Sequence, residues 1–423
     1  MTIVHLRELA SLARSKNPRG VTSVCSAHPL VLRAAIRFGK LHGSMILIEA
    51  TCNQVNHLGG YTGMQPADFA RLVYGIAQEE DCPASQIVLG GDHLGPNPWR
   101  SKPAEEAMIE AEKMMTAYVA AGFRKLHLDC SMGCKGEPPA LDDETTAKRA
   151  ARLANVAEQT AQRDGGTMPV YVIGTEVPPP GGADHVLDGI QPTFPAAARQ
   201  TLVVHRKIFA EAGLSGAFSR AVGLVVQPGV EFGNHNVIAY DRSKAKALSG
   251  LLAEEPQFVF EAHSTDYQGT KMLRQLVEDG FPILKVGPEL TFVLREALYA
   301  LDHIASILVE TYGERPLFKD MEDVMLRRPS DWERHYSGSA SEQKFLRHFS
   351  LSDRIRYYWP DPQAQAAVQR LFDTLRHRHV PRPLFDQYLP HAAHLSDGPI
   401  IPEEAVISHV TRSIEAYHAA CGH

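Results

Sequence analysis

One segment of the chain decides the fold, and it contains the runs QIVLGGD (86–92), AEEAMIEAEKMMTAYVAAG (104–122) and RKLHLDC (124–130). The first and third runs are short and apolar and end in polar residues, which is typical of strands buried on both faces. The run between them has apolar residues at helical spacing and ends at Gly122, a residue suited to a helix C-cap. The segment therefore predicts a strand, a helix and a second strand parallel to the first.

The same alternation of apolar runs and helical stretches recurs along the chain. Eight apolar runs are present, namely GVTSVCS (20–26), SMILIEA (44–50), QIVLGGD (86–92), RKLHLDC (124–130), MPVYVIGTE (168–176), AVGLVVQPG (221–229), QFVFEAH (257–263) and FPILKVG (281–287). Eight strand-helix units favour an α/β fold closed into a (β/α)8 barrel. An open doubly wound sheet is the alternative.

The strand rhythm stops near residue 300, where the chain becomes helical and aromatic. We predict a barrel over residues 1–310 and a helical extension over 311–423 that packs on it, because no Gly/Ser-rich linker separates the two. The N-terminal run MTIVHLRELASLARSKNPRG (1–20) predicts a short amphipathic helix that ends before Asn17 and Pro18.

Composition limits the class of protein. Of the 423 residues, 44% are hydrophobic and 22% are charged, which is typical of a globular protein with a sizeable core. The net charge of -6 is spread without long runs of one sign, so we expect no nucleic-acid or membrane partner. The six cysteines have no paired spacing, and there is neither a signal-peptide pattern nor an 18-residue apolar run. We expect a cytoplasmic protein with free thiols that forms an oligomer.

Polar residues follow every predicted strand, at the barrel end where the active sites of such folds lie. In chain order they are Ser26 and His28; Glu49, Thr51, Asn53, Gln54 and Asn56; Asp92 and His93; His127 and Asp129; Thr175 and Glu176; Gln227, Glu231, His235 and Asn236; Glu261, His263, Ser264 and Asp266; and Lys285. A single Asp or Asn at such a place commonly caps the next helix. Eight polar ends together indicate a functional site, because burying unpaired ionisable groups is costly.

The histidines and carboxylates among these residues fit a catalytic metal site. Imidazole nitrogen and carboxylate oxygen bind zinc and similar divalent ions, and three protein ligands leave one position open for chemistry. We predict His93, His263 and one of Glu231 or His235 as the ligands.

Asp92 is predicted to transfer protons beside this metal. Neighbours in an extended strand point to opposite faces, so Asp92 and His93 both reach the site only where the strand gives way to a loop, a break that Gly95 and Pro96 mark. The other predicted catalytic residues are Glu176, Lys285 and Asp129. The predicted substrate-binding residues are Glu49, Asn53, Gln227, Ser264, Asp266, Arg354 and Arg356.

Motifs along nearly the whole chain resemble one known family. They are VCSAHPLVL (24–32), IEATCNQVNHLGGYTGM (48–64), GGDHLGPNPW (90–99), LHLDCSMGC (126–134), YVIGTEVPPPGG (171–182), VVQPGVEFGNHN (225–236), EAHSTDYQ (261–268), LKVGPELTF (284–292) and LSDRIRYYWP (351–360). The chain is similar to the accessory subunits of D-tagatose-1,6-bisphosphate aldolase, proteins of galactitol and tagatose catabolism often labelled tagatose 6-phosphate kinases. These subunits resemble class II zinc aldolases in their barrel. The resemblance implies zinc and a ketose phosphate substrate, with Asp92 as proton donor to the aldol oxygen and His93 and His263 as metal ligands.

The sequence departs from the class II aldolases at two places. Catalytic subunits carry another His or Cys after the Asp-His pair, where this chain has Leu94, and their glycine- and serine-rich phosphate loop is replaced by STDYQ (264–268). A dihydroxyacetone phosphate site of the usual form is therefore not expected. Arg354 or Arg356 is the alternative phosphate ligand, unless both arginines form surface ion pairs.

Three functions stay open at this point. The resemblance suggests a subunit that stabilises and activates a separate class II aldolase subunit. A complete metal site would instead make the protein a D-tagatose 6-phosphate 4-epimerase that acts alone by retro-aldol and aldol chemistry. A non-catalytic sugar-phosphate sensor is the third. A kinase is rejected, because the chain has no GxxxxGK[ST] phosphate loop.

Overall fold

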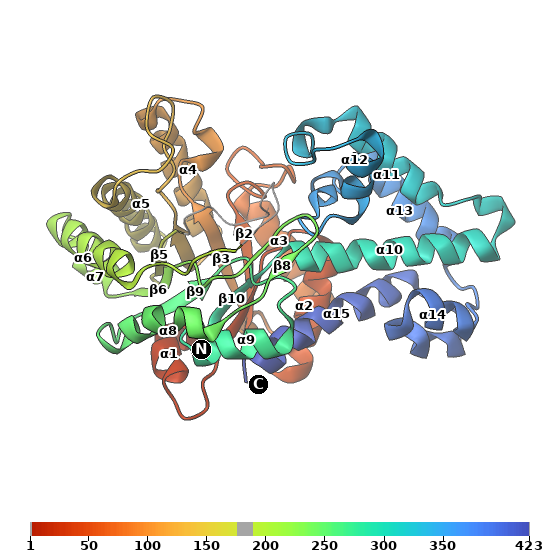
Figure 1. Ribbon diagram of the computed structural model, residues 1–423, viewed down its shortest axis with the longest axis horizontal. Coiled ribbons are helices and arrows are strands. Elements are labelled where there is room, and N and C mark those ends of the chain that lie inside the picture. Colours follow the sequence, from red (N-terminus) through yellow and green to blue (C-terminus); the bar gives the residue numbers. More distant parts are fainter. Residues whose placement is uncertain (1, 176–188, 423) are drawn as a thin grey trace.

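Eight parallel strands close into a barrel in the computed structural model, which describes residues 2–175 and 189–422 (Figure 1). Their order around the barrel is β1-β10-β9-β6-β5-β4-β3-β2. The strands span Val21–Val24 (β1), Ile46–Thr51 (β2), Ile87–Leu94 (β3), Lys125–Leu128 (β4), Val170–Gly174 (β5), Ala221–Val225 (β6), Val259–Ala262 (β9) and Ile283–Val286 (β10). All eight overlap the predicted apolar runs, so the (β/α)8 prediction is confirmed.

Helices on the outside of the barrel connect successive strands. They are α2 (Pro29–His42), α3 (Pro66–Glu79), α4 (Ala104–Ala120), α5 (Asp143–Arg163), α6 (Pro195–Glu211), α7 (Ser215–Phe218), α8 (Arg242–Gly250) and α9 (Gly269–Glu278). A short antiparallel hairpin of β7 (Glu231–Phe232) and β8 (Val237–Ile238) follows β6. Among the described residues, no helix is both long enough and apolar enough to cross a bilayer.

The N-terminal helix α1 (Thr2–Ala13) closes one end of the barrel. Its Leu6 and Leu9 are buried in an apolar cluster with residues at the beginnings of the strands, among them Val21, Val88 and Val170. This end of the barrel is therefore filled by hydrophobic packing, and the carboxyl ends of the strands are left for chemistry.

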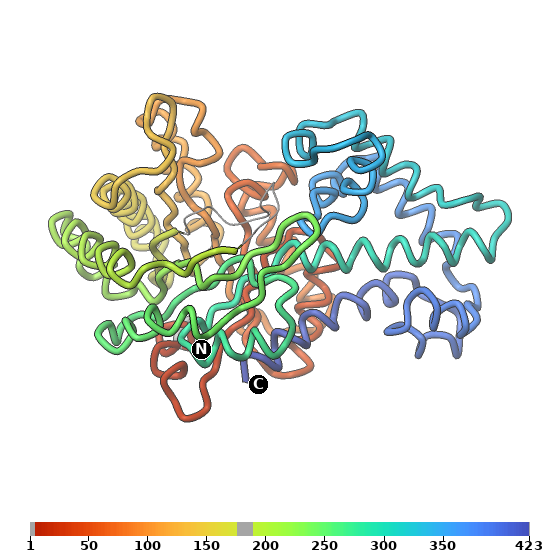
Figure 2. The backbone as a smooth tube through the Cα atoms, viewed as in Figure 1, coloured from red at the N-terminus to blue at the C-terminus, as the bar shows by residue number. Residues whose placement is uncertain are grey.

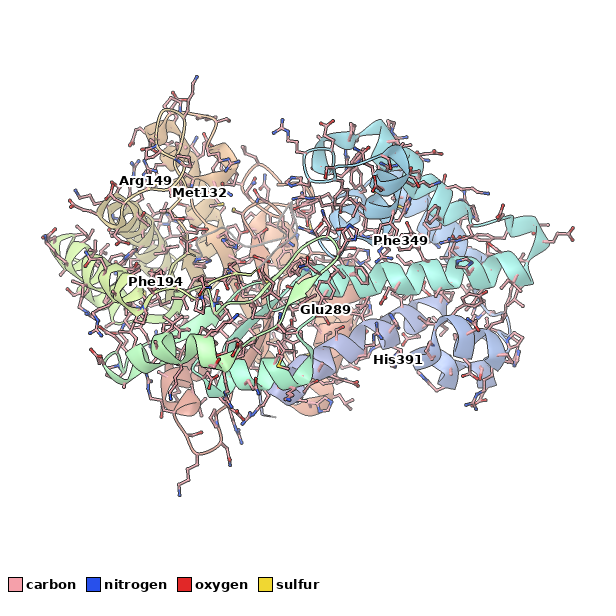
Figure 3. The ribbon with its side chains drawn as sticks, viewed as in Figure 1. Met132, Arg149, Phe194, Glu289, Phe349 and His391 are labelled. Atoms are coloured by element: carbon pink, nitrogen blue, oxygen red, sulfur yellow. The ribbon has the colours of Figure 1, made fainter. Side chains whose placement is uncertain are left out.

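After β10 the chain leaves the barrel and comes back. The helices of this part are α10 (Pro288–Leu308), α11 (Pro316–Arg327), α12 (Ala340–Phe349), α13 (Pro362–Leu375), α14 (Arg382–Tyr388) and α15 (Pro402–Ala420). Figure 2 shows α10 running out and the C-terminal α15 running back. In Figure 3, Glu289 lies where α10 leaves the barrel, and Phe349 and His391 lie in the helical region beyond it.

Helix α15 packs against α2, α9 and α10 and contacts β1. It thus lies in the barrel wall between α9 and α2. We propose that α15 completes this wall and belongs to the barrel, and that α11 to α14 form the extension. The barrel and the extension then meet at two points of the chain, before α11 and before α15, rather than at residue 310 alone.

Candidate active site

An irregularity in β3 brings Asp92 and His93 to the same site. The strand continues through both residues to Leu94, and its pairing with β4 shifts between Gly91 and Leu94. His93 has a φ of 50°, a left-handed conformation that is uncommon for residues other than glycine. The expected change from strand to loop is therefore wrong in detail, because a bulge inside the strand turns the two neighbours.

Two glycines of this segment leave room for the site. A Cβ on Gly90 would lie 2.7 Å from Cγ of Glu49, and a Cβ on Gly95 would lie 1.7 Å from the carbonyl oxygen of Asp129. The sequence GGDHLG therefore places Asp92 and His93 between glycines whose lack of a side chain lets the Glu49 side chain and the Asp129 backbone approach closely.

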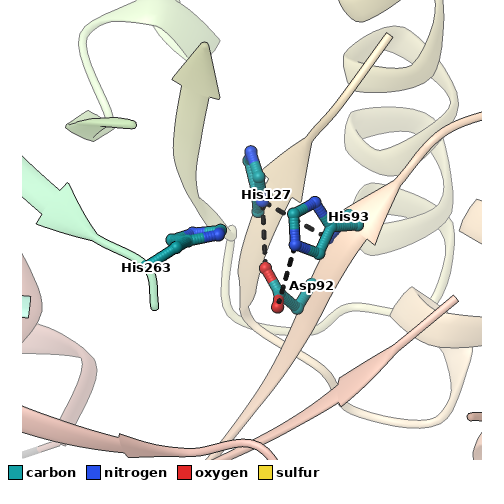
Figure 4. A group of neighbouring side chains, drawn as sticks. All are labelled: Asp92, His93, His127 and His263. Atoms are coloured by element: carbon teal, nitrogen blue, oxygen red, sulfur yellow. Dashed lines mark hydrogen bonds and ion pairs between the residues drawn. The ribbon is translucent and has the colours of Figure 1, made fainter. Parts of the chain in front are cut away.

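Asp92, His93, His127 and His263 form one group, in which one ligand atom of each lies within 4.8 Å of the others (Figure 4). His127 comes from β4, and His263 follows β9 and faces the other three. Nε2 of His127 lies 3.0 Å from the carbonyl oxygen of Gly174, which only accepts, so this nitrogen carries a hydrogen and Nδ1 faces Asp92 at 2.9 Å.

The structure does not bring the two other predicted ligands into this group. His235 lies in the turn of the β7-β8 hairpin, where it is exposed and its ring stacks on Phe345 at 5.8 Å. Glu231 is buried, and its Oε1 accepts the N–H of Phe232 at 2.9 Å. His127 stands in the group instead, a residue to which the sequence analysis gave no role.

Asp129 holds His93 in position. Its Oδ2 lies 2.8 Å from Nδ1 of His93, and its Oδ1 accepts a hydrogen bond from Ser131 at 3.0 Å. This contact leaves Nε2 of His93 available to a metal, which is the usual function of a carboxylate behind a histidine ligand. Asp129 thus lies behind the site rather than at the reacting atoms.

A buried ion network lies beneath the group. Nζ of Lys125 contacts Glu49 at 2.6 Å and Glu261 at 2.7 Å, and Nζ of Lys285 contacts Glu49 at 2.5 Å and Asp92 at 2.9 Å. Glu49, Lys125 and Glu261 have no solvent exposure. Glu49 therefore pairs with the lysines and does not line the cavity above, although it was predicted to bind substrate.

Burial and charge shift the pKa values of this group in opposite directions. Burial opposes the charged form of Asp92, but His93 and Lys285 outweigh it and hold the pKa of Asp92 well below its usual range. Burial likewise opposes the charged form of His93, yet Asp92 and Asp129 raise its pKa to about 9. For His263 burial prevails and lowers the pKa to about 4. Asp92 is thus ionised and His263 neutral at neutral pH.

The donor set fits a divalent cation. Three imidazoles and one carboxylate converge, and the coordination chemistry of zinc and similar ions uses these groups. The surrounding network holds four carboxylates, those of Glu49, Asp92, Asp129 and Glu261, against the ammonium groups of Lys125 and Lys285. A histidine that binds a metal must be neutral, so binding would displace the proton that His93 holds. Two negative charges are then in excess, and one divalent ion would balance them.

A cavity of about 750 Å³ opens above this group. Its walls include Asp92, His93, His263 and Lys285 from the barrel and Arg354 and Arg356 from the extension, and of the other predicted substrate-binding residues Asn53, Ser264 and Asp266 line it. Gln227 does not, because its Oε1 accepts the N–H groups of Gly229 and Val230 and shapes the loop after β6. Glu176 lies outside the described residues.

The sequence analysis gave no role to Lys125, His127 or Glu261. The run KLHLD (125–129) contained a signal for two of them, since alternate residues of a strand face the same side and Lys125, His127 and Asp129 alternate.

Comparison with known proteins decides the family. The sequence profile of the D-tagatose-1,6-bisphosphate aldolase subunit GatZ/KbaZ-like family matches residues 6–422. The chain belongs to this family. One relative, named D-tagatose 6-phosphate 4-epimerase, from Agrobacterium fabrum, is 57% identical over 417 residues, which cover 99% of this chain and 98% of the relative.

A solved structure of similar sequence also matches this GatZ/KbaZ-like chain. It carries the description "probable tagatose 6 phosphate kinase" and comes from Sinorhizobium meliloti 1021. It is 53% identical, with a TM-score of 0.88 over 95% of this chain and 100% of that chain. Two close relatives thus bear names for different reactions, one an epimerase and the other a kinase.

Proposed function

We propose that this protein is a metal-dependent D-tagatose 6-phosphate 4-epimerase that works by retro-aldol cleavage and recombination. The observation that carries the proposal is the convergence of Asp92, His93, His127 and His263 beside Lys285 at the floor of one cavity. A scaffold has no use for these buried groups. A relative 57% identical over almost the whole chain is named for this activity.

In the proposed reaction one proton is removed and returned, and one carbon-carbon bond breaks and forms again. Asp92 takes the proton of the C4 hydroxyl, the C3–C4 bond breaks, and its electron pair stays on the C1–C3 half as an enediolate while C4 becomes an aldehyde. The aldehyde rotates so that its other face points to C3. C3 attacks this face, and the C4 oxygen regains a proton. The product differs from D-tagatose 6-phosphate only at C4 and is D-fructose 6-phosphate.

The residues around Asp92 prepare it for this proton transfer. Lys285 donates to its Oδ1 at 2.9 Å and fixes the carboxylate. A zinc or similar divalent ion held by His93 and His263, with Asp92 or His127 as further donors, would stabilise the negative charge that develops on the ketose oxygens. Glu176, which the sequence predicts as a catalytic residue, is the candidate for the second proton transfer.

The family description favours a second candidate. A GatZ/KbaZ-like protein is described as an aldolase subunit, so this chain would stabilise or activate a class II aldolase partner. Phosphate transfer is not proposed, because the full sequence has no GxxxxGK[ST] loop for a nucleotide.

Incubation of the purified protein with D-tagatose 6-phosphate and with its 1,6-bisphosphate, with and without added zinc, tests the proposal. NMR follows the products. Metal-dependent formation of D-fructose 6-phosphate supports the epimerase. Absence of any product, together with activation of an added class II aldolase subunit, would reject it in favour of the accessory subunit.

A further inference from the structure

The phosphate position common in barrels is blocked in this protein. Such barrels often hold phosphate at a helix N-terminus after the last strands. Here the N–H groups of Gly287 and Glu289, at the start of α10, donate to Oδ1 of Asp266 at 3.0 and 2.8 Å. The carboxylate of Glu289 lies beside them and accepts the N–H of Tyr267 at 2.6 Å. A phosphate there would meet the carboxyl groups of buried Asp266 and half-buried Glu289, so we expect it to bind elsewhere in the cavity.

Arg356 offers a positive charge to the same cavity. Its Nη1 donates to the main-chain oxygens of Ser352 and Asp353, and its Nη2 donates to the hydroxyl of Tyr357 at 3.0 Å. Among residues 2–175 and 189–422, no carboxylate lies within ion-pair distance of this guanidinium. The half-buried cation is thus held by neutral groups and is available to an anion.

The loop 350–356 holds Arg356 at a fixed place. Oδ1 of Asn234 accepts a hydrogen bond from a serine of the loop at 2.7 Å, and the hydroxyls of Tyr267 and Thr291 donate to the loop at 2.7 and 2.5 Å. These three residues come from the β7-β8 hairpin, the loop after β9 and α10. The barrel therefore positions Arg356 before any ligand binds.

His28 presents a second donor with a defined hydrogen position. It is the N-cap of α2, and its Nδ1 accepts the N–H of Leu30 at 3.3 Å, so Nε2 carries the hydrogen. His28 lines the cavity with its ring edge against Trp359, and no described residue accepts from Nε2. Burial lowers the pKa of His28 to about 4, so the ring stays a neutral donor at neutral pH.

We propose that Arg356 and His28 together bind the terminal phosphate of the ketose phosphate. This inference rests on the proposed function for the identity of the sugar. In D-tagatose 6-phosphate the phosphate belongs to the C4–C6 half, and the C1–C3 half belongs at the metal group. A phosphate held by the extension therefore keeps the aldehyde in the cavity while the aldehyde rotates. The end of the cavity at Asp266 then accepts the unphosphorylated C1.

Binding of inorganic phosphate, followed by ³¹P NMR titration of the full-length protein, tests the inference without any turnover. Arg356→Gln is expected to weaken phosphate binding about 10- to 100-fold, because it removes a charged donor. His28→Asn can still cap α2 and is expected to weaken binding about 3- to 10-fold. Arg370→Gln is the matched control, because Arg370 pairs with Asp320 on the exposed face of α13 and does not line the cavity.

Steady-state kinetics adds a second readout. Arg356→Gln is expected to raise KM for D-tagatose 6-phosphate about 10- to 100-fold, whereas the control Arg370→Gln should leave KM unchanged. Arg356→Lys keeps the positive charge but loses the two-pronged guanidinium, so its KM should lie between those of the wild type and Arg356→Gln. Thermal melting shows which variants are folded.

Either of two results would overturn the inference: a wild-type protein that binds no phosphate, or folded Arg356→Lys and His28→Asn variants that bind it as the wild type does. The two proposals can fail separately. If the wild type converts neither sugar phosphate, the epimerase proposal fails. If Arg356→Gln nevertheless binds phosphate more weakly and Arg370→Gln binds it normally, the phosphate site stands.

Discussion

The two ends of the barrel bury opposite kinds of side chain on the same eight strands. Where α1 closes the barrel, Leu6 and Leu9 pack on strand residues such as Val21. Inside the barrel Lys125 is buried, as is Asp92 near its carboxyl end, but these charged side chains depend on ion pairs and hydrogen bonds. Apolar burial stabilises the fold outright, whereas burial of charges costs desolvation energy that the pairing only offsets. Substitutions at the two ends should therefore separate catalysis from stability.

The largest effect is expected for Asp92→Asn. Asparagine keeps the shape but cannot take a proton, so kcat for epimerisation of D-tagatose 6-phosphate should fall about 10²- to 10⁴-fold, measured by NMR. The melting temperature should show that the variant is folded. A folded variant that keeps more than about a tenth of the wild-type rate would exclude Asp92 as the acid/base residue.

Loss of metal is expected for His263→Ala. Removing a ligand from the group should lower bound metal from about one ion per chain to almost none, measured by elemental analysis after dialysis. His235→Ala is the matched control, because His235 is exposed and stacks on Phe345. Equal retention of metal in both variants would show that the described group is not the metal site.

At the closed end, Leu6→Ala should reduce stability and leave chemistry intact. Leu6 is fully buried, so the free energy of unfolding in urea should fall by about 2 to 5 kcal/mol, with kcat within about twofold of the wild type. Leu41→Ala is the control, since Leu41 is 79% exposed and should change stability by less than about 0.5 kcal/mol. A large loss of kcat in Leu6→Ala would mean that the two ends are coupled.

The smallest effect is a pH dependence of stability at the start of α10. Burial and the charge of Glu289 raise the pKa of Asp266 to about 7, whereas the unfolded value is about 4. Between these values the folded chain keeps a proton that the unfolded chain loses, so the free energy of unfolding falls as pH rises from 4 to 7.

Asp266→Asn isolates this contribution, because asparagine keeps an oxygen for the two N–H groups and does not titrate. Between pH 5 and pH 8 the wild type should lose about 1 to 3 kcal/mol relative to the variant, measured by urea unfolding at each pH. Parallel pH profiles of the two proteins would contradict the raised pKa.

The sequence predicted the strands better than the site. Apolar runs of strand length, each followed by a helical stretch, gave all eight barrel strands, because periodicity and local capping decide these elements. Asp92, His93 and His263 came from the same pattern together with the family resemblance. His235 illustrates the limit: the spacing EFGNH cannot tell which side of a hairpin faces the barrel, and the hairpin turns His235 to the surface.

Lys125 illustrates a second limit. A lysine within a strand gives no sign of whether it lies at the surface or between two buried carboxylates from β2 and β9. Neither acid is near it in sequence, so the pairing exists only after the barrel closes.

The sequence by itself determined the alternation of strands and helices, the amphipathic α1 and the family, because each depends on residues that are neighbours along the chain. Only the tertiary structure decided which buried charges neutralise one another and that the carboxylate of Asp266 occupies the N-terminus of α10. Only the tertiary structure showed that Arg356 shares a cavity with His28, far away in the sequence. The reason is physical: the energy of a buried charge is set by the groups within a few ångströms, and in a closed barrel these come from every part of the chain.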